Sequence, residues 1–325
     1  MPTNVTGTGN TWNLPNFAGD LFTASPTKTP FLSAIGGLSG GLKTKSDEFN
    51  VGQLYEFPAA AQPAISETAS ETAPTATALV REQKTNVTQI FHETISLTYA
   101  KLANSGKLAG LNLAGQKANP ASEKDWQIAR RLEKIARDVE YTFLNGTYQK
   151  ATAANVANKT RGMFELCSTG TTLSALDANE DPTILSLAML RTLYKMMADN
   201  GAQFNTMRLY CNSFQKQRIT NLYESQLGYN KGANRNEGGM NITRIETDFF
   251  FMDVVYNPFV PVDKILIADI AACAPVFQEV PDKGVLFLEP LAKTGAADRE
   301  QLYGEIGLDH GPAFLHASIT GLATS

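Results

Sequence analysis

Histidine and cysteine, the side chains that most often serve as nucleophiles, general bases and metal ligands, are scarce in this chain. There are 3 His and 3 Cys among 325 residues. The cysteines are Cys167, Cys211 and Cys273, and no CxxC pair exists. Zinc and redox sites usually need such paired spacing. The pattern therefore predicts three unpaired, buried thiols in a reducing compartment.

The three histidines do not form a recognisable catalytic or metal-binding pattern. His92 lies beside Glu93 in a predicted strand, whereas His310 and His316 flank a Gly-Pro turn. Pro312 breaks any helix between the last two, so they are not an i,i+4 metal pair. There is no G-x-S-x-G nucleophile motif, and the carboxylates cannot be paired from sequence. We therefore predict no catalytic, cofactor-binding or metal-binding residues and no enzyme activity. A cytosolic carboxylate-dependent hydrolase stays open as an alternative.

The composition indicates a folded protein and argues against a dedicated nucleic-acid binder. The apolar fraction is 43% and the charged fraction 18%, which allows a sizeable core. Lys and Arg total 28 and Asp and Glu total 32, so the net charge is -4. Nucleic-acid binders usually carry excess cations to pair with phosphates. No apolar run of 18 residues and no signal-peptide pattern is present, so we expect no membrane span and no secretion.

Residues 1–43 have the pattern of an extended arm. Prolines and glycines break any helix there: Pro2, Pro15, Pro26, Pro30, Gly36, Gly37, Gly40 and Gly41. Large apolar side chains, including Phe17, Phe22 and Phe31, are nevertheless frequent. Such an arm needs a surface to lie on, either in its own chain or in a neighbour.

Residues 44–98 have the pattern of a long two-stranded excursion. Apolar residues over 49–57 predict one strand, and those over 87–99 predict its return. Between them, Pro58–Ala78 holds eight Ala and three Pro, and its only charges are Glu67 and Glu71. A two-stranded ribbon is marginal in water, so we expect it to rest on a partner. A floppy surface loop is the alternative.

The clearest helix is predicted over residues 122–145. Ser122 and Asp125 form a capping box, and Asn145-Gly146 ends the helix. One apolar face follows from residues at three- and four-residue steps: Trp126, Ala129, Leu132, Ile135, Val139 and Phe143. Arg130, Arg131 and Arg137 suggest a basic patch, but neighbouring acids favour a solvated, cross-paired face.

The remaining segments predict an α+β fold, because helices and strands occur in separate blocks. A helix that starts at Asp181-Pro182 and runs to about residue 200 precedes a strand at Met207–Cys211 and a second helix from residue 213 to about 224. A Gly- and Asn-rich loop over 228–241 has no phosphate-binding pattern. Further strands are predicted over residues 242–256, 265–268, 285–288, 301–308 and 313–320.

The order of these parts resembles the major capsid proteins of tailed bacteriophages, which have the HK-97-type fold. Several stretches carry the resemblance: Thr29–Leu32, Arg130–Gly146, Thr160–Met163, Ile245–Asp269, Leu291–Gly295, Gly304-Glu305 and Ala317–Leu322. They occur in the family's order over nearly the whole chain. Phe250 stands where the family's strand pattern has Gly, so the local backbone is expected to differ there.

The resemblance implies a division of the chain into five parts. These are an N-terminal arm (1–43), an E-loop (44–98), a P-domain (99–154) with its spine helix at 122–145, an A-domain (155–240), and a strand-rich return (241–325) shared between the P- and A-domains. The implied assembly contacts are Phe17, Phe22, Phe31, Glu67, Glu71, Arg130, Arg131 and Arg137.

The resemblance also implies a function in the virion. Copies would form hexamers and pentamers of an icosahedral shell in the host cytoplasm and enclose double-stranded DNA without sequence-specific binding. No long coiled N-terminal segment is present, which implies a separate scaffolding protein or none, beside a portal and a decoration protein. No cofactor and no membrane are expected. An encapsulin-like bacterial compartment, which shares the fold, is the nearest alternative.

Overall fold

The computed structural model describes residues 28–57, 59–75, 77–100, 123–168, 171–175, 184–226 and 243–324. Phe17, Phe22, Ser122, the Asp181-Pro182 pair and the loop at 228–241 lie outside these residues. Among the described helices, none is long and apolar enough to cross a membrane.

The described elements confirm an α+β fold. The helices are α1 (Pro30–Ala34), α2 (Glu67–Ser70), α4 (Glu123–Asn145), α5 (Met163–Ser168), α6 (Leu187–Asp199) and α7 (Ser213–Gln226), with short 3-10 turns η2 (Ile270–Ala272) and η3 (Ala313–Leu315). The strands are β1 (Leu42–Thr44), β2 (Glu48–Tyr55), β3 (Arg81–Val87), β4 (Gln89–Thr98), β5 (Thr171–Ser174), β6 (Met207–Cys211), β7 (Arg244–Glu246), β8 (Phe251–Tyr256), β9 (Ile265–Asp269), β10 (Ala274–Gln278), β11 (Leu286–Pro290), β12 (Ala297–Asp309) and β13 (Ala317–Thr320).

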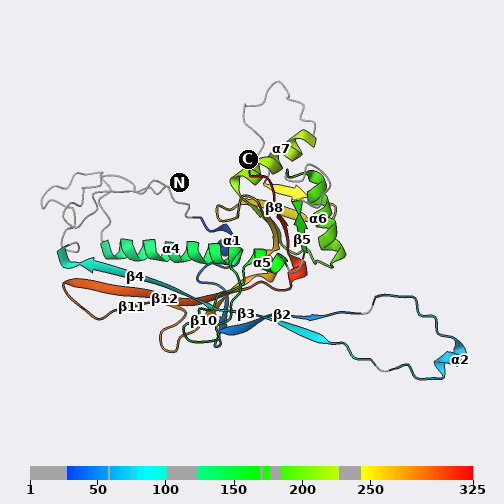
Figure 1. Cartoon of the computed structure of the whole chain (residues 1–325), viewed down its shortest axis with the longest axis horizontal. Helices are drawn as coiled ribbons and strands as arrows, with labels where there is room; N and C mark the ends of the chain where they lie inside the picture. The colour runs from blue at the N-terminus through cyan, green and yellow to red at the C-terminus, as the bar shows by residue number, and fades with distance from the viewer. Residues whose placement is uncertain are drawn as a thin grey trace.

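A five-stranded sheet lies beneath the long helix α4 (Figure 1). Its centre is β12, which pairs with β4, β10 and β11, while β1 adds to β10. Ile135, Val139 and Phe143 of α4 are buried in one core with Phe91 and Ile306 of the sheet. The predicted apolar face of the helix is thus confirmed at these positions. Ala129, also predicted for that face, is exposed.

A six-stranded mixed sheet forms a second layer structure, with α6 packed against it. Its order is β5-β13-β9-β6-β8-β7, so β5 and β7 are the two edges. Strand β9 is buried at every position, as expected for a strand in the middle of a covered sheet. Figure 1 shows this sheet with α6 and α7 gathered near the C-terminal end of α4.

The two-stranded ribbon of β2 and β3 projects away from both sheets, with α2 at its far end (Figure 1). The predicted return strand over 87–99 is wrong in its extent, because the return is Arg81–Val87. Residues Gln89–Thr98 form β4 and pair with β12 instead. Phe91, Ile95 and Leu97 alternate along β4 because their side chains are buried in the body of the protein. The exposed ribbon strand is the more polar segment before them, Arg81–Val87.

Two other strand predictions are corrected by the structure. Residues 242–256 are not one strand, since a turn at Thr247–Phe250 separates β7 from β8. Residues 313–320 begin with the 3-10 turn η3, and only Ala317–Thr320 is a strand. Both errors follow from apolar runs that continue through a turn, where hydrophobicity alone cannot mark the break.

Candidate assembly surfaces

The ribbon exposes an apolar belt where its two strands end. This belt consists of Tyr55 and Phe57 on one side and Leu79 and Val80 on the other, with Phe57 71% and Val80 82% exposed. The Tyr55 and Phe57 rings pack edge to face with centroids 5.3 Å apart. Isolated exposed apolar residues are common, but a cluster of large ones is typical of an interaction site.

The tip of the ribbon is acidic. The single-turn helix α2 is capped by Ser66, whose Oγ accepts a hydrogen bond of 3.1 Å from the N–H of Ala69. Glu67 and Glu71 are both exposed there, and neither forms an ion pair with a described residue. Their carboxylates are therefore available to a cation outside this copy of the chain.

The basic residues of α4 are mostly paired within the chain, but acids of the same helix, as predicted, supply only part of this pairing. Arg130 pairs with Glu133 at 2.5 Å, and Arg131 pairs at 3.1 Å with Glu93 of β4. Arg137 differs, because its buried Nε has no hydrogen-bond partner among the described residues. The side chains of Arg130 and Arg131 are 51% and 40% exposed, and ion pairs near the surface contribute little to folding stability.

The root of the arm is anchored in its own chain. The N–H groups of Phe31 and Leu32 donate to the two carboxylate oxygens of Glu140 on α4, at 2.9 and 2.6 Å, and the Asn257 amide donates at 2.6 Å. Burial raises the pKa of Glu140, and these hydrogen bonds oppose the rise. Phe31 is fully buried, with its ring edge to face with Tyr210 at 5.4 Å. Phe31, predicted as an assembly contact, is thus already covered without a neighbour.

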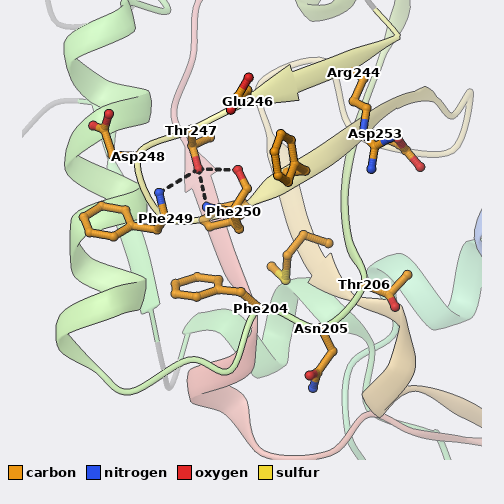
Figure 2. Close-up of a pocket in the computed structure, with 12 residues that line it drawn as sticks. Phe204, Asn205, Thr206, Arg244, Glu246, Thr247, Asp248, Phe249, Phe250 and Asp253 are labelled. Carbon is orange, nitrogen blue, oxygen red and sulfur yellow. Dashed lines mark hydrogen bonds and ion pairs between the residues drawn. The ribbon is translucent and has the colours of Figure 1, made fainter.

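The family-like strand pattern around Thr247 is a tight turn beside an aromatic hollow. Figure 2 shows Thr247 Oγ1 accepting hydrogen bonds from the N–H groups of Phe249 and Phe250, at 3.3 and 2.9 Å, and donating to the Phe250 carbonyl at 2.7 Å. Phe250 is buried and stacks at 4.4 Å on Phe204. Phe204 has a φ of 52°, which is rare for an aromatic residue and needs such packing. The hollow has a volume of about 490 Å³.

Asp269, the acid that ends the resembling stretch, is a buried structural acceptor. Its carboxylate accepts the N–H groups of Asn205, Thr206 and Ala271 at 3.2, 3.0 and 3.1 Å. It therefore holds the loop before β6 against the end of β9. This side chain is fully buried, and the three hydrogen bonds offset the free energy that burial of an unsatisfied carboxylate would cost.

The Thr160–Met163 motif is explained by a close approach of two backbones. A Cβ on Gly162 would lie 2.5 Å from the nitrogen of Gly146, so only glycine fits there. The hydroxyl of Thr160 accepts the N–H of Leu308 at 3.2 Å, and the guanidinium of Arg161 lies 4.5 Å from the centre of the Tyr148 ring. This motif locks the end of α4 to β12.

His310 and His316 are buried structural residues. His316 Nδ1 accepts the N–H of Asp269 at 3.2 Å, so its Nε2 carries the proton and donates to the His310 carbonyl at 2.7 Å. His310 donates from Nδ1 to the Gly311 carbonyl at 2.7 Å. Burial lowers the pKa of each imidazole from 6.5 to about 4.

The described residues offer no group of three or more His, Cys, Asp or Glu that could hold a metal ion. All three cysteines are buried and unpaired, as predicted. Burial raises the pKa values of Cys167 and Cys211 to about 12, so these thiols stay protonated and are poor nucleophiles.

The sequence could not identify Glu140 or Asp269 as buried anchors. The one available signal was an acid inside the apolar stretch of α4, because Glu140 follows Val139 and precedes Phe143 and Leu144. Of the predicted contact residues that the structure describes, Arg130, Arg131 and Arg137 share α4, and Glu67 and Glu71 share the ribbon tip. The ribbon tip that carries α2 lies far from α4 of the same copy (Figure 1).

Comparison with protein families found a match to the SU10 major capsid protein model over residues 4–323. The comparison with curated proteins found no match. A solved capsid of cyanophage A-1(L) is similar at 12% identity with a TM-score of 0.64, over 96% of this chain and 98% of that one. The capsid of a native GTA particle is similar at 13% identity and a TM-score of 0.60, over 98% of each chain. The SrpI encapsulin of Synechococcus elongatus PCC 7942 is similar at 9% identity and a TM-score of 0.56, over 96% of this chain and 93% of that one.

Proposed function

The chain belongs to the SU10 major capsid protein family, and from this we propose that copies of it close into an icosahedral shell of hexamers and pentamers around double-stranded DNA. It is a major capsid protein with the fold of tailed-phage capsids. The subdivision proposed for it is the arm at 1–43, the E-loop at 44–98, the P-domain at 99–154, the A-domain at 155–240 and the shared strands at 241–325. The projecting part of the E-loop ends with β3, because β4 pairs with β12 in the body of the protein.

The observation that carries the proposal is the projecting ribbon with its exposed apolar belt. An isolated two-stranded ribbon is only marginally stable in water. Burial of the exposed Phe57 and Val80 side chains against a neighbouring copy would remove apolar surface from water and stabilise the ribbon. We propose that the ribbon lies across the α4 helix of the adjacent copy. Many such heterologous contacts close into a shell when the rotation between copies closes.

Charge supports the same placement. Glu67 and Glu71 at the tip have no ion-pair partner among the described residues of their own chain. Arg130, Arg131 and Arg137 offer cations on the helix that the ribbon would reach. In the shell, Phe17 and Phe22 of the arm would add further contacts between copies.

Electron microscopy and sedimentation of the full chain, expressed with and without its neighbouring gene products, test the proposal. Closed particles of megadalton mass are the expected result. A protein that stays monomeric under every one of these conditions would contradict it.

The contents and partners of the shell are part of the proposal. With a net charge of -4, the subunit would enclose DNA but bind it only weakly, because affinity for DNA depends on cations that pair with phosphates. The proposed partners are a separate scaffolding protein, a portal and a decoration protein, with assembly in the host cytoplasm. Tight, salt-sensitive binding of DNA to the free subunit would argue against this picture.

A bacterial compartment is the second candidate, because one of the similar structures is an encapsulin. The family match over residues 4–323 favours the phage capsid. Particles that contain a protein cargo and no DNA would favour the compartment. The family is a structural one, so we propose no enzymatic activity for the chain.

A further inference from the structure

Among the residues that the structure describes, the edge strand β7 and the hollow beside it form an open surface on the six-stranded sheet. The N–H of Val254 donates to the carbonyl of Thr243 at 2.8 Å. Because hydrogen-bonded pairs alternate along an antiparallel ladder, the backbone groups of Arg244 and Glu246 point away from β8. Phe249 and Phe251 flank the hollow and are 50% and 56% exposed. An exposed edge beside large apolar side chains is a usual site of association.

The charge of this surface is negative. Arg244 lies 3.7 Å from Asp253 and 5.4 Å from the centre of the Phe251 ring. Glu246 and Asp248 are exposed, and no cation of the described residues forms an ion pair with either. Figure 2 shows both carboxylates at the rim of the hollow. A partner that is complementary to this surface would therefore carry positively charged groups at the ends of side chains with apolar stems.

The exposed face of α6 supplies that chemistry on the same chain. Arg191 and Lys195 are one helical turn apart and both exposed. Neither forms an ion pair with a described residue, whereas the opposite face of α6, with Leu190 and Leu193, is buried in the core. Long basic side chains pack their methylene stems on apolar surface while the charged ends reach carboxylates.

We propose that the hollow of one copy receives the Arg191 and Lys195 face of α6 from a second copy. Phe249 and Phe251 would cover the stems, and Glu246 and Asp248 would bind the charged ends. The two surfaces are different patches, so the contact is heterologous and repeats around a ring. This contact would be an additional contact between copies within the proposed shell, so it rests on that proposal. It does not involve the ribbon or α4.

A charge-swap mixing experiment tests the contact. One variant carries Glu246→Lys and Asp248→Lys, and the other carries Arg191→Glu and Lys195→Glu. All four positions are exposed, so both variants should fold, which circular dichroism and thermal unfolding check. Each variant alone puts like charges across the contact and should lower the particle yield at least roughly tenfold relative to the unaltered chain.

Mixing the two variants restores opposite charges only between different copies. The mixture should therefore give more particles than either variant alone, because the two variants can alternate around six-membered rings and leave only one like-charge contact in each five-membered ring. A pairing within one chain would not be rescued by mixing. If the unaltered chain assembles and the mixture yields no more particles than either variant alone, or if each variant assembles normally alone, the contact is overturned. If the unaltered chain forms no particles at all, the proposed shell falls and the contact falls with it.

Discussion

The backbone N–H of Leu32 donates a 2.6 Å hydrogen bond to Oε2 of Glu140, a residue 108 positions later in the chain. Oε1 of the same carboxylate accepts from Phe31 and from the Asn257 amide. One side chain of α4 therefore joins the root of the arm to the turn that follows β8. The described root of the arm is therefore fixed to α4 within a single copy of the chain.

Glu140→Gln should destabilise the subunit by about 1–3 kcal/mol, because one acceptor oxygen becomes an amide donor that faces a backbone N–H. Urea unfolding of the unassembled subunit measures the loss. Glu133→Gln on the same helix is the matched control. Glu133 pairs with Arg130 near the surface, so Glu133→Gln should lower the free energy of unfolding by only about 0–1 kcal/mol. Equal effects of the two substitutions would show that Glu140 is no anchor.

Phe57→Asp should abolish particle formation and leave the subunit folded. The side chain is 71% exposed, so a charge there costs the free subunit little, but it opposes burial against an adjacent copy. Phe57→Leu keeps an apolar group and should assemble. Sedimentation gives the particle fraction, and circular dichroism checks the fold. Normal assembly of the aspartate variant would exclude the apolar belt from the contact.

Gly162→Ala should destabilise the subunit by about 1–3 kcal/mol or more, because overpacking forces the backbone to move. The new methyl would lie 2.5 Å from the nitrogen and 2.9 Å from the oxygen of Gly146. The control is Gly201→Asn, where φ is +82° and nothing lies within 4 Å of a Cβ. Asparagine tolerates that conformation, so thermal unfolding should change little. A stable, normally folded Gly162→Ala variant would contradict the close approach.

The sequence predicted the elements whose periodicity is strong and local. The apolar steps of Ile135, Val139 and Phe143 identified α4 because a long amphipathic helix repeats its signal several times. The short strand Met207–Cys211 and the helix after it were also predicted within a few residues. The arrangement of parts, by contrast, came from a resemblance across the whole chain and not from any single pattern.

The errors and omissions have a common physical cause, which is that long-range partners decide them. Residues 89–98 look like the return of a ribbon until β12, some 200 residues later, is known to pair with them. Glu140 and Asp269 are acids whose role depends on backbone N–H groups far away in the sequence. Phe31 was predicted to contact a neighbouring copy because no local sequence pattern indicates that it packs on Tyr210 of its own chain.

Acid should destabilise the free subunit between about pH 6.5 and pH 4, and His310 and His316 should cause much of the loss. Burial lowers both pKa values from 6.5 to about 4. The unfolded chain thus takes up protons in this range while the folded chain does not, so their contribution is present above pH 6.5 and lost as the pH falls toward 4. From pH 7 to pH 5 the loss should be about 2 kcal/mol for each histidine.

His310→Gln should reduce this pH dependence by about half, as measured by urea unfolding at several pH values. His310 is the better position to replace because its Nε2 has no hydrogen-bond partner among the described residues. His92→Gln is the matched control, because it replaces a histidine that lies on the exposed side of β4 and not in the core. The buried Glu140, whose pKa is raised, acts in the opposite direction near the acid end, because protonation there favours the folded state. An unchanged slope in the His310→Gln variant would mean that His310 is not held neutral by its burial.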